Sequence, residues 1–168
     1  ELRSAELGAF VRDHVFFPST MVDRIVPATT DEDRRMVYEL TGSWDAWPVV
    51  TEPFTQWVVE DRFGAGRPPL EEVGVQMVAD VRPYELMKLR MLNGSHSMIA
   101  YLGYLAGYQY VSDAIANPVL RKFIHDFMTD EAMPSLPQTL DRIAYREALL
   151  ERFGNPSLKH RTWQIAMD

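Results

Sequence analysis

The apolar positions divide the chain into a first part of short, mixed segments and a second part that is helical. In the first part, the pattern predicts strands at residues 15–17 and 54–59, while residues 73–81 are ambiguous between a strand and a short helix. Between the strands, Thr30 and the three acidic residues after it predict a helix start, because a hydroxyl cap and acidic side chains suit the free N–H groups. Gly42 is expected to end that helix.

The second part has the 3.6-residue periodicity of amphipathic helices. The pattern extends over residues 83–107, starting at a proline that suits the first helical position, with a possible bend at Asn93-Gly94. Asn117-Pro118 predicts the start of the next helix, a further helix is expected over residues 138–153, and Asn155-Pro156 is expected to start another. The sequence therefore predicts a mainly α fold with a small β element near its start.

The composition allows one globular domain and excludes several classes of protein. The chain has 168 residues, of which 46% are hydrophobic, a net charge of −7 and a pI of about 5.1. An acidic surface without basic clusters argues against nucleic acid or an anionic membrane as a partner. No apolar run reaches the roughly 18 residues of a membrane-spanning helix. The absence of cysteine excludes a disulfide and a thiolate nucleophile, and it fits a cytoplasmic protein.

Several motifs of known chemistry are missing from the sequence. The nine glycines form neither G-x-G-x-x-G nor a phosphate loop, so none of them can cradle a dinucleotide pyrophosphate. The four histidines lack the spacing of metal ligands, and the adjacent Ser95 and His96 do not form a nucleophile elbow. We therefore expect neither a metal site nor a serine hydrolase.

Both ends of the sequence have the character of cut ends. The chain starts at Glu1 without an initiator methionine, and it closes at Asp168 inside an apolar pattern with no glycine or proline stop. We expect it to be a fragment of a longer protein.

One nine-residue segment holds three side chains suited to proton transfer and hydrogen bonding. Lys88, Asn93 and His96 provide an amine, an amide and an imidazole, which together can handle a carbonyl or an alcohol. At about 100° per residue of an α-helix, Asn93 lies about 140° and His96 about 80° from Lys88, so all three share one side. The apolar neighbours indicate a buried segment, where an unpaired charge is costly. The alternative is a chance group on a solvated surface, or in a core where each polar group has a partner.

Three stretches give this segment a specific context. They are residues 18–27, which contain M-V-D-R, residues 52–61, and residues 83–96, which contain K-x-x-x-x-N-x-x-H. Together they resemble the polyol-specific long-chain dehydrogenases, the mannitol dehydrogenase family. The resemblance continues through residues 101–107, 152–156 and 160–168 and so covers nearly the whole chain. It is closest to the fructuronate reductase, or D-mannonate oxidoreductase, branch.

The resemblance implies a two-domain enzyme. An N-terminal Rossmann domain would bind a nicotinamide cofactor, and a mainly helical C-terminal domain would carry the catalytic residues. Residues 1–27 are then the end of the cofactor-domain region and its connection, and residues 28–168 are the front part of the helical domain. Because the glycine motif is missing, we expect the Rossmann domain itself to lie outside this chain, and NAD to be bound mainly by that absent domain.

The resemblance also implies roles for five side chains. Lys88 is expected to be the general acid/base, and Asn93 and His96 to hold the reacting oxygen. Asp23 is expected to belong to the substrate pocket, and Glu85 to connect the lysine with bulk water.

The residues by themselves leave other roles open for the two carboxylates. Asp23 could pair with Arg24 or cap a helix, and Glu85 could pair with Lys88 or with Arg82 at a helix start.

The function that the resemblance implies is an NAD-dependent, metal-independent oxidoreductase that interconverts a hexonate or polyol with its keto sugar. Fructuronate and mannonate are the favoured pair, and mannitol or another polyol is the alternative. A helical interaction module without catalysis is the hypothesis from another class. The substrate stereochemistry, the choice of NAD over NADP and the oligomeric state stay open. The isolated chain is expected to be inactive, because nothing in it holds the cofactor.

Overall fold

The structure is a computed structural model that describes residues 3–167, so the predictions that involve Glu1 and Asp168 lie outside the described residues. The first part of the chain contains α1 (Ala5–His14), β1 (Thr20–Asp23), α2 (Asp31–Thr41), β2 (Gln56–Glu60), the 3₁₀ turn η1 (Leu70–Val73) and β3 (Gln76–Val78). The second part contains α3 (Arg82–Met87), the π-helical turn η2 (Lys88–Asn93), α4 (Gly94–Leu105), α5 (Val111–Ala116), α6 (Pro118–Asp126), the π-helical turn η3 (Phe127–Ala132), the 3₁₀ turn η4 (Met133–Ser135), α7 (Arg142–Phe153) and α8 (Thr162–Met167).

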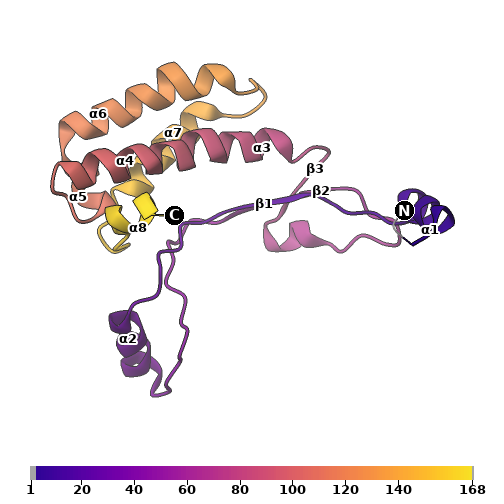
Figure 1. Cartoon of the computed structure of the whole chain (residues 1–168), viewed down its shortest axis with the longest axis horizontal. Helices are drawn as coiled ribbons and strands as arrows, with labels where there is room; N and C mark the ends of the chain where they lie inside the picture. Colours follow the sequence, from indigo (N-terminus) through magenta and orange to yellow (C-terminus); the bar gives the residue numbers. More distant parts are fainter. Residues whose placement is uncertain (1–2, 168) are drawn as a thin grey trace.

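The second part forms a helical body with a single apolar core (Figure 1). Ile99 of α4, Ile115 of α5, Ile124 of α6 and Leu149 of α7 are almost completely buried there. Burying a side chain of this size stabilises a fold by about 1.5–3 kcal/mol. Because α4 contacts α5, α6 and α8, the residues at its start are held on a fixed frame. No helix within residues 3–167 is long and apolar enough to cross a membrane.

The three strands form one sheet that extends from the body towards α1 (Figure 1). The central strand β2 pairs antiparallel with β1 and parallel with β3. Along β1 the exposed and buried side chains alternate, as expected for a strand with one buried face, so Met21 and Asp23 are buried. The end of β1 thereby carries a carboxylate to the edge of the helical body.

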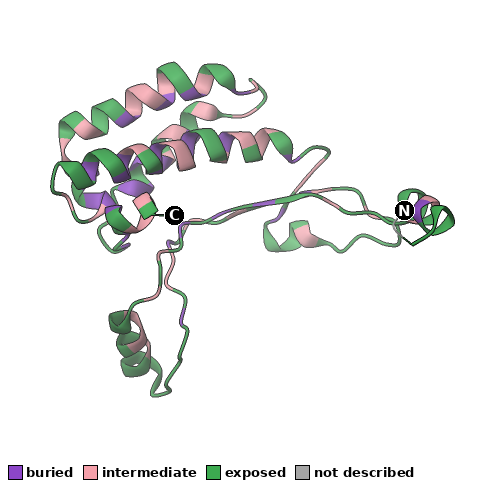
Figure 2. Cartoon of the chain, viewed as in Figure 1, coloured by how far each residue is buried: buried purple, intermediate pink, exposed green. Residues whose placement is uncertain are grey.

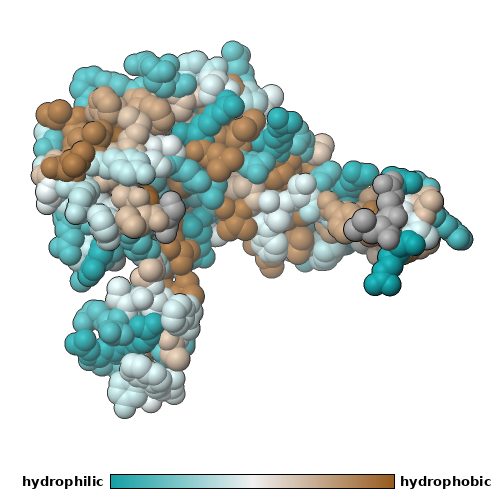
Figure 3. Space-filling view, in the orientation of Figure 1, coloured by the Kyte–Doolittle hydropathy of each residue, from teal (hydrophilic) through white to brown (hydrophobic). Residues whose placement is uncertain are grey.

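Helix α2 projects from the body on a long connection (Figure 1), and none of its residues is buried (Figure 2). A capping box supports it: Thr30 Oγ1 accepts from the Asp33 amide at 3.3 Å, and Asp33 Oδ2 accepts from the Thr30 amide at 2.7 Å. Gly42 ends the helix in the left-handed conformation, with φ 72°. The predicted start and end of this helix are thus confirmed. Hydrophobic surface gathers where the segment leaves the body, and the projecting lobe itself is mainly hydrophilic or neutral (Figure 3).

The predicted boundaries differ from the structure at three places. Residues 15–17 are not a strand, because they follow α1 as unpaired chain, and pairing begins only at β1. The helix predicted over residues 138–153 starts at Arg142, where Asp141 accepts from a backbone amide as its cap. Asn155-Pro156 forms a turn, and the next helix begins at Thr162.

Candidate active site

Lys88, Asn93 and His96 lie on one continuous helical rod built from α3, η2 and α4. The rod is not uniformly α-helical, because η2 has the wider π-helical turn. At the end of η2, the Gly94 amide donates to the carbonyl of Leu89, five residues back. Lys88 is the first residue of this turn and Asn93 is the last, so the spacing of these two side chains is set by π-helical geometry.

Lys88 and Asn93 are both half-buried, and within residues 3–167 neither side chain forms a hydrogen bond or an ion pair. The backbone carbonyl of Asn93 accepts a hydrogen bond from the Ser97 hydroxyl at 3.2 Å, which leaves the side-chain amide uncommitted. An amine and an amide without protein partners can both donate hydrogen bonds to a ligand oxygen.

His96 is buried, with 9% of its surface exposed, and its ring packs against two other rings. The ring centroids are 4.8 Å apart for Phe153 and 5.2 Å apart for His160. Burial lowers the pKa of His96 to about 3, and the electrostatic effects of the neighbouring His160, Arg152 and Lys88 act in the same direction. His96 is therefore neutral near pH 7. Its buried Nε2 has no hydrogen-bond partner among the described residues, so this nitrogen keeps its hydrogen-bonding capacity unused.

Asp23 is completely buried beneath the site and carries hydrogen bonds on both oxygens. Arg152 donates from Nη2 to Oδ1 at 2.6 Å and from Nη1 to Oδ2 at 3.0 Å, and the Tyr145 hydroxyl donates to Oδ2 at 2.6 Å. Burial raises the pKa of Tyr145, and the Asp23 charge raises it further, so Tyr145 stays a donor. The alternative pairing with Arg24 does not form, because that guanidinium donates to Thr51 and to a carbonyl.

Arg152 is the centre of this cluster and has a second carboxylate partner. Its Nε and Nη2 donate to the two oxygens of Glu52 at 3.0 and 2.8 Å, and its guanidinium carbon lies 3.9 Å from the centre of the Phe54 ring. Burial opposes the charged form, but the hydrogen bonds that Arg152 donates to Asp23 and Glu52 raise the pKa of Arg152 above its ordinary value. The buried cluster of Asp23, Glu52, Tyr145 and Arg152 thus holds one cation between two anions.

The sequence contains one sign of this cluster, an arginine among apolar residues of a helix, but no local motif identifies its partners. Arg152 follows Leu149 and Leu150 and precedes Phe153, so it stands among the buried residues of α7. An arginine in such a place needs buried partners, but the partners lie 100 and 129 positions earlier in the chain.

Glu85 is exposed in the first turn of α3, three residues before Lys88. Within the described residues it forms an ion pair neither with Lys88 nor with Arg82, so the alternatives considered for it do not occur. Its position at the solvent side of the same helix is compatible with a proton path towards Lys88.

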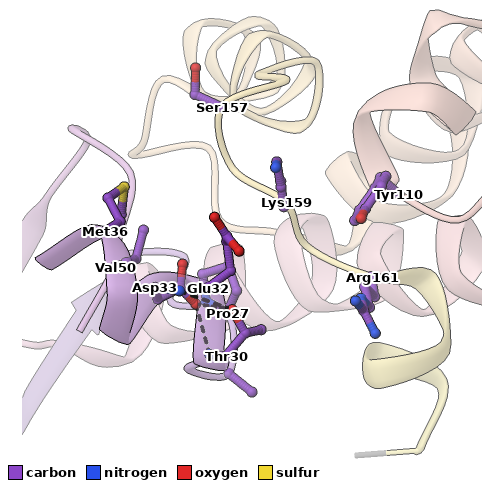
Figure 4. A pocket seen from close by; sticks show the side chains of 11 residues that line it. Pro27, Thr30, Glu32, Asp33, Met36, Val50, Tyr110, Ser157, Lys159 and Arg161 are labelled. Carbon is purple, nitrogen blue, oxygen red and sulfur yellow. Dashed lines mark hydrogen bonds between the residues drawn. The ribbon is translucent and has the colours of Figure 1, made fainter. Parts of the chain in front are cut away.

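The cavities beside these residues differ strongly in size. A cavity of about 10 Å³ borders His96 and Arg152, which is room for no more than a water molecule. A larger cavity of about 450 Å³ lies between the start of α2 and residues 157–161, and Figure 4 shows Glu32 and Asp33 on one side of it and Lys159 and Arg161 on the other. Its lining includes none of the candidate catalytic residues.

The glycines with positive φ among the described residues do not form a cradle for a dinucleotide pyrophosphate. The glycines with positive φ are Gly42, Gly66, Gly74 and Gly107, and no atom lies within 4 Å of the place where a side chain would begin. None of them therefore marks a tight backbone cradle of the kind that holds a pyrophosphate. The residues of this chain can donate hydrogen bonds to an oxygen and exchange a proton with it.

Two family models match the chain in succession. The Mannitol dehydrogenase Rossmann domain matches residues 1–72, and the Mannitol dehydrogenase C-terminal domain matches residues 80–168. The prediction of a mainly α chain without the Rossmann domain is therefore wrong. The expectation that NAD is bound mainly by a domain absent from the chain is wrong for the same reason. The error arose because the glycine motif is only one part of such a domain, and its absence says nothing about segments such as β1 and β2. The division predicted at residues 27 and 28 stays a prediction.

Relatives and solved structures agree with these matches. The chain is 52% identical to the D-mannonate oxidoreductase of Escherichia coli over 170 residues, which cover 100% of the chain and 35% of the relative. It is 47% identical to the mannitol 2-dehydrogenase of Aspergillus fumigatus, with 99% of the chain and 34% of the relative covered. The chain thus spans about a third of the length of these relatives.

The structural comparison gives the same result. A ternary complex of Pseudomonas fluorescens mannitol 2-dehydrogenase with NAD and D-mannitol superposes with a TM-score of 0.85 at 42% identity, covering 98% of this chain and 34% of that one. A substrate-free D-sorbitol dehydrogenase gives a TM-score of 0.86 at 39% identity, with the same coverage. Family models, relatives and fold therefore agree, and the chain belongs to the mannitol dehydrogenase family.

Proposed function

We propose that the gene product containing this chain is an NAD-dependent oxidoreductase that interconverts a hexonate or polyol with its keto sugar. The observation that carries the proposal is a set of three polar side chains on one helical rod, those of Lys88, Asn93 and His96. Among the described residues, the Lys88 amine, the Asn93 amide and His96 Nε2 have no hydrogen-bond partner in the protein. The 52% identity to D-mannonate oxidoreductase favours mannonate and fructuronate, and the mannitol dehydrogenases keep mannitol as the second candidate. Both candidates are small molecules, and we propose the cytoplasm as the place of action.

The proposed chemistry follows from the charge that the reaction creates. Reduction of a ketone places negative charge on its oxygen, and two hydrogen-bond donors aimed at that oxygen contribute about 3 kcal/mol each. We assign these donors to Asn93 and to neutral His96, whose low pKa keeps it an N–H donor without a net charge.

Lys88 is proposed to supply the proton to that oxygen and to remove it in the direction of oxidation. For the oxidation, the amine must first lose its own proton to solvent. Glu85 is proposed to relay this proton, because it lies exposed one helical turn before Lys88.

Asp23 is proposed to support the site from beneath. Both of its oxygens accept hydrogen bonds from Arg152 or Tyr145, and its charge opposes the effect of Arg152 on His96. Direct contact of Asp23 with a substrate stays a prediction, since it requires one of these donors to move.

The proposal is tested by assaying the natural gene product with NADH and either fructuronate or fructose. We expect turnover with fructuronate, and Lys88→Ala should lower kcat about 10²- to 10⁴-fold because the proton donor is lost. Lys122→Ala is the matched control. Among residues 3–167 this exposed lysine pairs with the neighbouring Asp126 on α6, so its loss should leave kcat unchanged. Equal rates for the wild type and Lys88→Ala would contradict the mechanism. Turnover of fructose alone would favour the mannitol alternative.

A further inference from the structure

The π-helical turn η2 changes the relation between Lys88 and Asn93. In an α-helix, the residue four positions on lies about one turn above the first, and the residue five positions on is rotated by about 140°. Hydrogen bonds from i to i+5 widen the turn by one residue. Asn93, the fifth residue after Lys88, therefore takes the place that the fourth residue has in an α-helix, and His96 follows one α-helical turn later in α4.

The wide turn ends at a glycine that is packed against an aromatic ring. A side chain at Gly94 would begin 3.3 Å from Cζ and 3.4 Å from Cε1 of Phe127, which is tighter than an ordinary contact. Phe127 opens the second π-helical turn η3, where the Met133 amide donates to the carbonyl of Met128, again five residues back. Two wide turns thus meet at this contact.

A second contact joins η2 to the 3₁₀ turn η4 that follows η3. Arg90, in the middle of η2, donates from Nη1 to the carbonyl of Ser135, the last residue of η4. The π-helical turn is therefore held at its end by Phe127 and in its middle by Ser135.

We propose that Gly94 and Phe127 are positioning residues, which keep η2 wide so that the Lys88 amine and the Asn93 amide reach the same substrate oxygen. The inference rests on the proposed function, because it concerns the geometry of that site. It also explains the K-x-x-x-x-N-x-x-H spacing as one π-helical turn followed by one α-helical turn.

The test adds one methyl group at the contact and then makes room for it. In the natural gene product, Gly94→Ala should push η2 away from the Phe127 ring and lower kcat about 10- to 100-fold, because small misplacements of reacting groups are costly. The KM for substrate should change less than kcat, and the pH dependence of kcat should shift, because the surroundings of the Lys88 amine change. Phe127→Leu keeps a smaller apolar side chain beside Gly94, so it should lower kcat less than Gly94→Ala does. The double variant Gly94→Ala/Phe127→Leu should recover most of kcat and the original pH profile.

Gly103→Ala is the matched control on the same helix. A side chain there would begin 3.1 Å from Ala114 Cβ and 3.3 Å from Thr162 Cγ2, so it should lower the stability of the protein without shifting the pH profile. Crystal structures of the single and double variants supply a readout besides activity: the separation of the Lys88 and Asn93 side chains should widen in Gly94→Ala and return in the double variant.

The outcomes separate the two proposals. Wild-type kcat and pH profile in Gly94→Ala, or a double variant no better than Gly94→Ala, would overturn the positioning role while Lys88→Ala still lowers activity. A shift of the pH profile in Gly103→Ala would also overturn it, because the effect would then be general loss of packing. Equal activity of the wild type and Lys88→Ala would instead remove the proposed function, and the positioning role with it.

Discussion

At the scale of single residues, the buried neutral imidazole of His96 links the candidate site to the stability of the fold. Its pKa is lowered to about 3 in the folded protein, whereas an unfolded histidine titrates near 6.5. The unfolded chain therefore binds more protons at this position than the folded one. The stabilisation is fully present above about pH 6.5 and is lost as the pH falls from there towards 3.

This linkage predicts a measurable slope. As the pH falls from about 6 to about 4, the protonation of His96 in the unfolded chain should lower the free energy of unfolding by about 1.4 kcal/mol for each pH unit. Urea denaturation at a series of pH values measures this slope. The variant His96→Gln should lose that part of the slope. The core variant Ile115→Val should be less stable by about 1 kcal/mol at each pH with the wild-type slope. A variant without His96 that kept the full slope would contradict the assignment.

The buried cluster around Arg152 gives a second prediction at this scale. Arg152→Met leaves the carboxylates of Asp23 and Glu52 buried without their cation, and the free energy of unfolding should fall by about 3–5 kcal/mol. Arg67→Ala is the control, because Arg67 also binds two carboxylates but at the surface, where such pairs contribute about 0–1 kcal/mol. Similar losses in urea denaturation for the two variants would show that burial does not set the strength of the cluster.

At the scale of elements, the structure separates what local sequence encodes from what it does not. Thr30 and Gly42 bound α2 as predicted, and Asn117 caps α6 by accepting from two backbone amides, because caps depend on residues within one turn. The π-helical turns could not be predicted, because a 3.6-residue periodicity in the sequence does not show where a turn contains one extra residue. The Arg152 cluster could not be predicted for a different reason, because its members are joined only by the tertiary fold.

Because α2 projects from the body, its cap should contribute to the local stability of α2 and not to the stability of the whole fold. Thr30→Ala removes one side of the capping box, which is typically worth about 1 kcal/mol. Because no residue of α2 is buried, the loss should appear as about fivefold faster hydrogen exchange of the α2 amides, with exchange in the helical body unchanged. Asn117→Ala should behave differently, since α6 packs on the core and its cap contributes to global stability. Faster exchange throughout the helical body in Thr30→Ala would contradict this view of α2.

At the scale of the whole molecule, the two matched family domains are parts of one folded structure. Asp23 and Glu52 lie in the part matched by the Rossmann-domain model, and Tyr145 and Arg152 lie in the part matched by the C-terminal model. Residues 80–168 produced alone should therefore be destabilised by a guanidinium without partners. Circular dichroism during urea denaturation should show a lower midpoint than for the whole chain, and Arg152→Met should raise the midpoint of the isolated part.

The cluster that crosses this boundary also constrains how the protein can change by recombination. A crossover between residues 72 and 80, where the two family models meet, would separate the carboxylates of Asp23 and Glu52 from Arg152. A hybrid assembled from two parents then folds well only if both parents bring matching charges to the same buried place. Because of the charge cluster, the two parts have to be inherited together from one parent or from parents with the same buried charges, although a separate family model matches each part.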